Sequence, residues 1–150
     1  MKKIIIARHG DYDDFGDMRL NARGQYQMSE LAKQLQPILG DSNVIILAST
    51  AKRASMSGDV MADELDCPIE FHEELVSGGG IPCKNEEVLK IIQSYDQFDI
   101  VILVTHMEYS GGLPPFIGEQ LCGVEFNPFA TNKGEAWVID LEAKTIERIH

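Results

Sequence analysis

Cysteine is scarce in this sequence, and its pattern excludes two kinds of stabilising site. The 150 residues contain three cysteines, Cys67, Cys83 and Cys122, which are widely spaced and never form a Cys-x-x-Cys pair. A disulfide framework or a zinc site uses paired, closely spaced thiols. We therefore expect ordinary thiols and a cytoplasmic location.

Long apolar runs are also missing. No stretch approaches the ~20 apolar residues that a membrane helix needs. The short run Met1–Ile6 ends almost at once, at Arg8 and His9. It is too short for a signal peptide and is typical of a first core strand. No membrane partner is expected.

Positive charge is in the minority, which limits the partners. A net charge of −11 disfavours binding to nucleic acid or to an anionic membrane. It does not exclude one phosphate group, because a local pocket can be basic on an acidic protein. The sequence also lacks a His-Glu-x-x-His motif, a P-loop and a carboxylate cage. We therefore expect neither a metal nor a cofactor.

What the sequence does contain is an alternation of short apolar runs and amphipathic segments. Strands are predicted over 3–7, 44–48, 69–71 and 100–105, followed by a closing antiparallel hairpin of 136–141 and 145–149. Helices are predicted from a cap at Asn21 to about 38, over 51–65, from a cap at Asn85 to about 95, and in part of 109–122, where Pro114 and Pro115 should kink or restart the helix.

This alternation predicts an α/β fold in one domain over 1–150. The expected architecture is a three-layer sandwich with a mostly parallel central sheet flanked by helices. Ligands of such sheets bind beyond the carboxyl ends of the strands. The segments just past the first, second and fourth strands are Arg8-His9-Gly10, Ser49–Arg53 and Thr105-His106. Two histidines and two arginines should therefore meet at one sheet edge.

These residue types suit metal-free phosphoryl transfer. His9 can attack phosphorus through a neutral ring nitrogen, while the Gly10 carbonyl accepts a hydrogen bond from the other nitrogen. Arg8 and Arg53 can clamp the phosphoryl oxygens with bidentate donors. His106, if protonated, adds a further donor. Each residue alone would be read as an ordinary surface or core side chain, as we read His72 and His150; their joint position favours a site.

The ordered motifs resemble the histidine phosphatase superfamily, the phosphoglycerate-mutase-like fold. Arg8-His9-Gly10 matches its name-giving motif. The segments 20–24, 49–57 and 104–106 resemble its Leu-Thr-x-x-Gly, Ser-Pro-x-x-Arg-Ala-x-x-Thr and second-histidine motifs. The resemblance implies that His9 is the phosphorylated nucleophile. It also implies that Arg8, Gly10, Arg53 and His106 bind the substrate.

Within the superfamily, the short chain is similar to the bacterial phosphohistidine phosphatases. Those proteins lack the large insertion that most mutases and sugar phosphatases carry before the second histidine, and 74–79 resembles their Glu-Leu-containing stretch. This sequence departs from the wider family in four places. The loop after His106 is Met107-Glu108-Tyr109 instead of a small, glycine-rich stretch, and the other three departures lie earlier in the chain. No asparagine follows the first motif within 11–16, Asn21 replaces the usual threonine, and Thr50 replaces the usual proline.

A general acid is not assigned by the sequence. Larger members take it from the segment after the third strand, near which Glu73 and Glu74 lie; Asp11 and Glu108 follow the two histidine motifs. Glu74 and Glu108 are the candidates we retain, although Glu74 could equally be a solvated strand end. An imidazole leaving group has a pKa of about 6.5, so a phosphohistidine substrate needs little acid help.

Three functions therefore remain open. The preferred one is a phosphatase that hydrolyses phosphohistidine on a protein partner. The second is a phosphatase, or less favoured a mutase, for small phosphate esters. The third is a protein that binds a phosphorylated ligand and has lost turnover, which Glu108 beside the anion pocket and the unassigned acid would fit.

Overall fold

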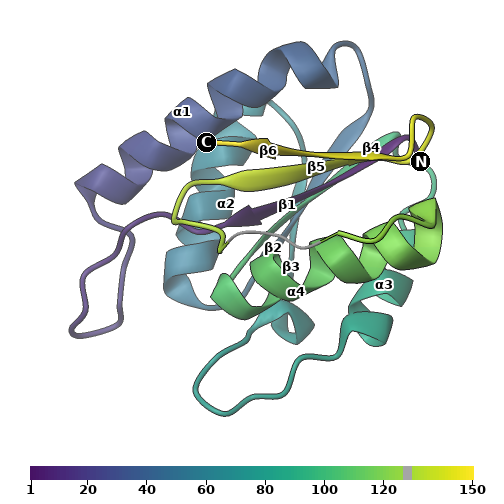
Figure 1. The fold of residues 1–150 in the computed structure, drawn as a ribbon. Coiled ribbons are helices and arrows are strands. Elements are labelled where there is room, and N and C mark those ends of the chain that lie inside the picture. The colour runs from purple at the N-terminus through teal and green to yellow at the C-terminus, as the bar shows by residue number, and fades with distance from the viewer. Residues whose placement is uncertain (127–129) are drawn as a thin grey trace.

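A six-stranded sheet forms the centre of the computed structural model, which describes residues 1–126 and 130–150 (Figure 1). Its strands are β1 (Lys3–Arg8), β2 (Val44–Ser49), β3 (Ile69–His72), β4 (Ile100–Thr105), β5 (Ala136–Asp140) and β6 (Thr145–Ile149), in the order β3-β2-β4-β1-β5-β6. The first four strands are parallel, and the β5–β6 hairpin joins β1 antiparallel. The predicted mostly parallel sheet and closing hairpin are confirmed.

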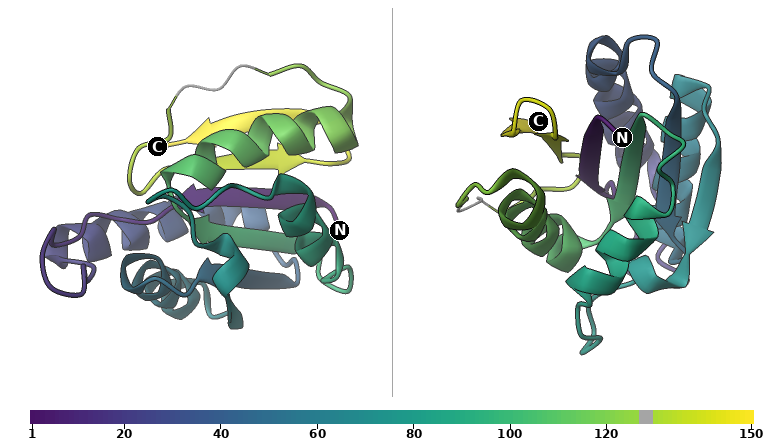
Figure 2. Two further views of the ribbon diagram at one scale, coloured as in Figure 1. Left: turned by 90° about the horizontal axis from the view of Figure 1, so that it is seen from below. Right: turned by 90° about the vertical axis from the view of Figure 1, so that its right-hand side faces the viewer.

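Helices cover both faces of the sheet (Figure 2). They are α1 (Ala22–Leu39), α2 (Lys52–Leu65), α3 (Asn85–Gln93) and α4 (Met107–Ile117). Because side chains alternate along a strand, Ile5 packs with Met28 of α1 in one apolar core, and Ile4 packs with Leu113 of α4 in the other. The three-layer sandwich is confirmed. No helix in the described ranges is long and apolar enough to cross a membrane.

The two predicted helix caps have different outcomes. Asn21 caps α1, where its side-chain oxygen accepts a hydrogen bond from the Gly24 amide at 2.9 Å. Asn85 does not cap α3, because the Lys84 carbonyl already accepts the first helical bond, from the Val88 amide at 3.0 Å. Helix α3 therefore starts one residue earlier than predicted, and Tyr95 lies beyond its end.

The sequence predicts that the two prolines of α4 kink or restart the helix, and the structure shows that they do not restart it. Helix α4 begins at Met107 and continues through Pro114 and Pro115 into a π-helical turn, η2 (Gly118–Cys122). Pro114 has no amide hydrogen for the carbonyl four residues earlier, that of Ser110. The Thr131 hydroxyl donates to that carbonyl at 3.0 Å instead. A hydroxyl from a distant segment therefore supplies the hydrogen bond to the Ser110 carbonyl that the proline cannot donate.

The antiparallel entry of β5 brings a distant loop to the functional edge of the sheet. Ala136, the first residue of β5, pairs with Ala7 near the end of β1. The loop before β5 therefore lies beside the Arg8-His9-Gly10 segment. The Gly134 amide donates to the carbonyls of both Arg8 and His9, at 3.2 and 3.3 Å.

Candidate active site

His9 stands at the carboxyl end of β1 with one ring nitrogen already committed. Its Nδ1 lies 2.8 Å from the Gly10 carbonyl oxygen. A carbonyl only accepts, so Nδ1 carries the proton and Nε2 keeps its lone pair. Burial lowers the pKa of His9 to about 4; the Gly10 bond partly opposes this, and the charges of Arg53, Arg8 and Lys133 add to it. His9 is therefore neutral near pH 7, as a nucleophile must be.

His106 follows β4 and lies beside His9, with 5.2 Å between the ring centroids. Its Nε2 is 2.8 Å from the Ser49 hydroxyl, whose oxygen also accepts from the Ala51 amide. Ser49 can thus donate its hydrogen to Nε2, which leaves the hydrogen of His106 on Nδ1. That Nδ1 is buried and has no partner among the described residues. In this tautomer Nδ1 carries a hydrogen that no described residue accepts.

The charge of His106 differs from the protonated form that the sequence analysis considered. Burial, followed by the neighbours His9, Arg53 and Arg8, lowers the pKa of His106 to about 3. The ring is neutral in the free protein, and its Nδ1–H donor does not require a positive charge.

The two predicted arginines reach the histidines from different elements. Arg8 ends β1 and donates through Nη1 to the Thr131 carbonyl at 2.9 Å. Arg53 lies in the first turn of α2, and its guanidinium carbon is 5.2 Å from the centroid of the Tyr12 ring. Both charges lower the pKa of both histidines, so the structure brings all four residues together.

Gly10 has a packing role that the sequence analysis did not foresee. A Cβ there would lie 2.7 Å from the Gly24 carbonyl oxygen, because the start of α1 crosses the loop closely. The Gly10 amide donates to the Ser57 hydroxyl at 3.0 Å, and that hydroxyl donates to the Arg53 carbonyl at 2.6 Å. This amide has no hydrogen left for a substrate, and the substrate-binding role of Gly10 stays a prediction.

Glu74 lies away from the histidine pair. It belongs to a short 3-10 turn, η1 (Glu73–Leu75), after β3, and its exposed carboxylate is 3.8 Å from Nδ1 of His72. The hollow that it lines also includes Lys84, Glu87 and Tyr109, and none of the four site residues. The structure therefore does not bring this candidate acid into the site.

Glu108 is placed more favourably. It lies in the first turn of α4, two residues after His106, and is half-buried. Its Oε1 accepts from the Ser77 hydroxyl at 3.0 Å. The loop at Gly78 packs over the same carboxylate. Glu108 is thus held by the loop at Ser77 and Gly78, close to His106 in the sequence.

Two residues that the sequence analysis missed border His9. The Tyr12 ring contacts the His9 ring edge-on, with 5.4 Å between the centroids. Nζ of Lys133 lies 4.8 Å from the Tyr12 centroid and 3.4 Å from Oδ1 of Asp11. The position of Tyr12 soon after the His9 motif was an available signal. Lys133 precedes an antiparallel strand, and no motif marks it.

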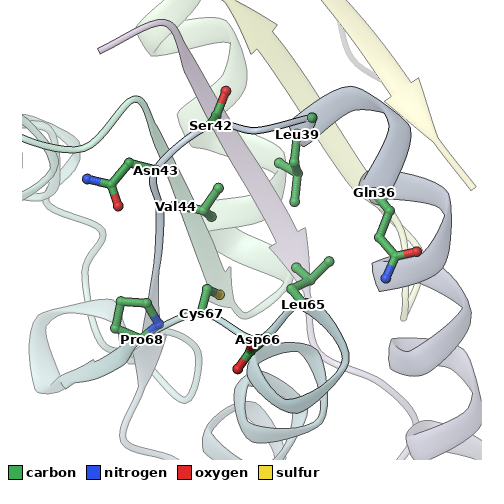
Figure 3. A pocket seen from close by; sticks show the side chains of 10 residues that line it. Gln36, Leu39, Ser42, Asn43, Val44, Leu65, Asp66, Cys67 and Pro68 are labelled. Atoms are coloured by element: carbon green, nitrogen blue, oxygen red, sulfur yellow. The ribbon is translucent and has the colours of Figure 1, made fainter.

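A separate hollow lies at the opposite edge of the sheet and carries no catalytic group (Figure 3). Its cavity of about 280 Å³ includes Val44, at the start of β2, and Leu65, at the end of α2. Burial raises the pKa of its Cys67 thiol to about 11, so this cysteine is a poor nucleophile. Within residues 1–126 and 130–150, no three acidic, histidine or cysteine side chains form a metal-binding group.

The lowered histidine pKa values predict acid sensitivity of the fold. Between pH 6.5 and about 4, the unfolded chain protonates His9 and His106 while the native protein keeps them neutral. The unfolded state then binds more protons, so the free energy of unfolding falls as the pH falls. Replacing His106 by Gln should remove about 2 kcal/mol of the loss between pH 7 and 4.5. Urea unfolding at both pH values measures it.

The carboxylates of both proteins titrate alike and provide the internal control. Equal losses of stability in wild type and His106→Gln would contradict a buried, neutral His106.

Comparison with solved structures finds the same fold in phosphatases. The protein histidine phosphatase SixA, complexed with tungstate, superposes with a TM-score of 0.73 at 19% identity, covering 99% of this chain and 94% of that one. A protein of Agrobacterium tumefaciens provisionally described as phosphohistidine phosphatase SixA gives 0.72 at 17%, covering 99% and 96%. The α-ribazole phosphatase of Shigella flexneri gives 0.64 at 16%, covering 96% and 93%. Identities this low show a shared fold alone.

A sequence-family comparison goes further than the fold. No curated protein matches the chain significantly. The family model described as the histidine phosphatase superfamily, branch 1, matches residues 4–78, which is half of the chain and includes His9 and Arg53. The chain belongs to the histidine phosphatase superfamily.

Proposed function

We propose that this protein is a phosphatase that uses His9 as its nucleophile and hydrolyses phosphohistidine on a protein. The observation that carries the proposal is the state of His9. Its Nδ1–H is held by the Gly10 carbonyl at 2.8 Å, its ring is neutral, and cationic side chains surround it. Such a ring presents a lone pair on Nε2 to an incoming phosphoryl group.

The first step transfers the phosphoryl group to the protein. The Nε2 lone pair of His9 attacks phosphorus, the bond from phosphorus to the substrate nitrogen breaks, and its electron pair stays on the leaving imidazole, which takes up a proton. Arg8 and Arg53 bind the phosphoryl oxygens, and the unpartnered Nδ1–H of His106 donates to one of them. These donors supply the positive charge, so we propose that no metal is required.

The second step restores the enzyme. Water attacks the phosphorus of phosphorylated His9, the bond to Nε2 breaks, and inorganic phosphate leaves. The electron pair returns to Nε2, while the proton of the attacking water passes to solvent or to a nearby base. The Gly10 carbonyl holds the ring in place throughout.

A nitrogen leaving group fits the groups present. Glu74 faces His72, and the Asp11 carboxylate is occupied by Arg23 at 3.0 Å and by Lys133 at 3.4 Å. Neither is free to serve as the acid that an alkoxide leaving group requires. Between β3 and β4 the chain has only η1, a loop and α3, without a large insertion to enclose a small substrate. An exposed phosphohistidine side chain suits this arrangement.

Glu108 supports a second candidate function, the hydrolysis of small phosphate esters. It lies two residues after His106 and is held by Ser77, so it could protonate an alkoxide. The two candidates differ in how the rate depends on the leaving group. They therefore make opposite predictions for a series of substrates.

We expect the single-turnover rate to depend steeply on leaving-group pKa, with phosphohistidine peptides cleaved faster than alkyl phosphates. The reason is that little proton is donated to the departing atom. Rapid-quench measurements on phosphohistidine peptides, aryl phosphates and sugar phosphates provide the slope. A flat dependence that Glu108→Gln abolishes would favour ester hydrolysis, and the exposed Glu119→Gln on η2 is the matched control.

The same panel tests the non-catalytic alternative. A protein that binds phosphohistidine peptides but turns over no substrate in the panel would be a phospholigand-binding member of the family. That result would contradict the proposed phosphatase activity.

We also propose that the protein acts in the cytoplasm. Cys67, Cys83 and Cys122 are free thiols. Thiols persist in a reducing compartment.

A further inference from the structure

A lysine from a distant loop joins the cationic groups around His9. Lys133 lies in the loop before β5, and its Nζ is 4.8 Å from the centroid of the Tyr12 ring. The same ring has the Arg53 guanidinium carbon at 5.2 Å and contacts His9 edge-on. Tyr12 therefore places two cations beside the nucleophile, each attracted to its aromatic ring.

The loop that carries Lys133 is bonded to the His9 segment itself. The Thr131 carbonyl accepts from Arg8 Nη1 at 2.9 Å, and the Gly134 amide donates to the Arg8 and His9 carbonyls. Thr131 is also fixed through its hydroxyl, which accepts from the Trp137 indole at 3.0 Å. Gly134 has a φ of +74°, and a Cβ there would lie 2.9 Å from Gln27 of α1. Hydrogen bonds of Thr131 and Gly134 therefore fix the backbone on both sides of Lys133.

Asp11 holds the Lys133 ammonium in the free protein. Its Oδ1 is 3.4 Å from Nζ, while its Oδ2 binds Arg23 at 3.0 Å and Gln27 at 3.1 Å. Because Arg23 and Gln27 also bind this carboxylate, Asp11 stays satisfied when Lys133 moves away. The four-carbon stem of a lysine allows its ammonium to turn from Asp11 towards an anion next to Tyr12.

We propose that Lys133 is a third cationic ligand of the phosphoryl group, held ready by Tyr12 and Asp11 and completing the set formed by Arg8 and Arg53. The inference deepens the proposed function and rests on it. The residues after His9, 11–16, include no asparagine, and Asp11 is itself an anion. Lys133 supplies from the other end of the chain a donor that this loop lacks. The substrate class that it favours is a phosphoryl group with two negative charges.

Tungstate, a tetrahedral dianion, tests the proposal without any turnover. In isothermal titration calorimetry, Lys133→Met should bind tungstate about tenfold more weakly than wild type, because one charged donor is lost. Lys133→Arg should restore most of the affinity. Lys90→Met, which removes an exposed charge from α3, is the matched control and should bind as wild type does.

A second measurement separates ligand binding from a structural role. The charged or titratable groups around His9 are Arg8, Tyr12, Arg53, His106 and Lys133. Removing the Lys133 charge should raise the pKa of His9 above its value of about 4, as read from its ring proton by NMR titration.

Equal tungstate affinity in wild type and Lys133→Met would overturn the proposal, and so would a wild-type protein that does not bind tungstate. Tungstate binding that depends on Lys133 in a protein that hydrolyses no phosphate compound would instead contradict the phosphatase activity and still support Lys133 as a ligand of the bound anion.

Discussion

His9→Ala should lose turnover by on the order of 10⁴-fold or more, together with all acid-labile phosphoenzyme. The covalent step has no substitute nucleophile, because the Nε2 of His106 is committed to Ser49 at 2.8 Å. Rapid mixing with labelled phosphohistidine peptide, followed by denaturation at acid and alkaline pH, measures both quantities. A phosphohistidine intermediate is lost in acid and survives in alkali.

The matched control is His72→Ala. His72 is also at the carboxyl end of a strand, as the last residue of β3, but its ring bonds to the Tyr95 hydroxyl at 2.8 Å rather than lying near His9. It should keep near-wild-type turnover. Thermal unfolding must show that His9→Ala is folded, since His9 is only 3% exposed. Retained phosphoenzyme in folded His9→Ala would refute the nucleophile and require another residue to carry the phosphoryl group.

Arg53→Ala should lower kcat by about 10²- to 10³-fold, the loss expected when a donor to the transition-state oxygens is removed. The Arg53 guanidinium contacts the Tyr12 ring, and no carboxylate in the described part of the chain forms an ion pair with it. It is therefore free to bind an anion. Steady-state kinetics should show a larger effect on kcat than on KM.

Two further variants separate a bidentate clamp from general electrostatics. Arg53→Lys keeps the charge but loses the planar pair of donors, so it should recover only part of the rate. Lys52→Ala removes an exposed positive charge from the adjacent position of α2 and should stay within about threefold of wild type, as a surface charge would. Equal losses in Lys52→Ala and Arg53→Ala would show that only the summed charge matters.

Local sequence patterns were sufficient to predict the fold and to place the residues that follow the strands at one edge of the sheet. The apolar runs ending at Arg8, Ser49 and Thr105 are buried parallel strands, and their ends share one edge by geometry alone. The cap at Asn21 followed from its side chain. These features depend on neighbours in sequence, which a sequence displays directly.

Features that depend on distant contacts escaped the sequence analysis. The continuation of α4 through Pro114 requires the Thr131 hydroxyl, and the placement of Lys133 requires the pairing of β5 with β1. The two candidate acids differ in their side-chain contacts: Glu108 accepts a hydrogen bond from Ser77, and Glu74 lies against His72. No spacing rule in the sequence indicates either contact. The pKa of His106 likewise depends on burial that only the folded protein reveals.

The antiparallel strand beside β1 also sets the order in which the site can assemble. Arg8 and its hydrogen-bond partner Thr131 are 123 residues apart, and the Gly134 amide that holds the His9 backbone is slightly more distant in sequence. Closing such a separation costs chain entropy and slows folding. On the ribosome, His9 emerges well before Thr131. The nucleophile is therefore synthesised well before the loop that completes its backbone hydrogen bonds.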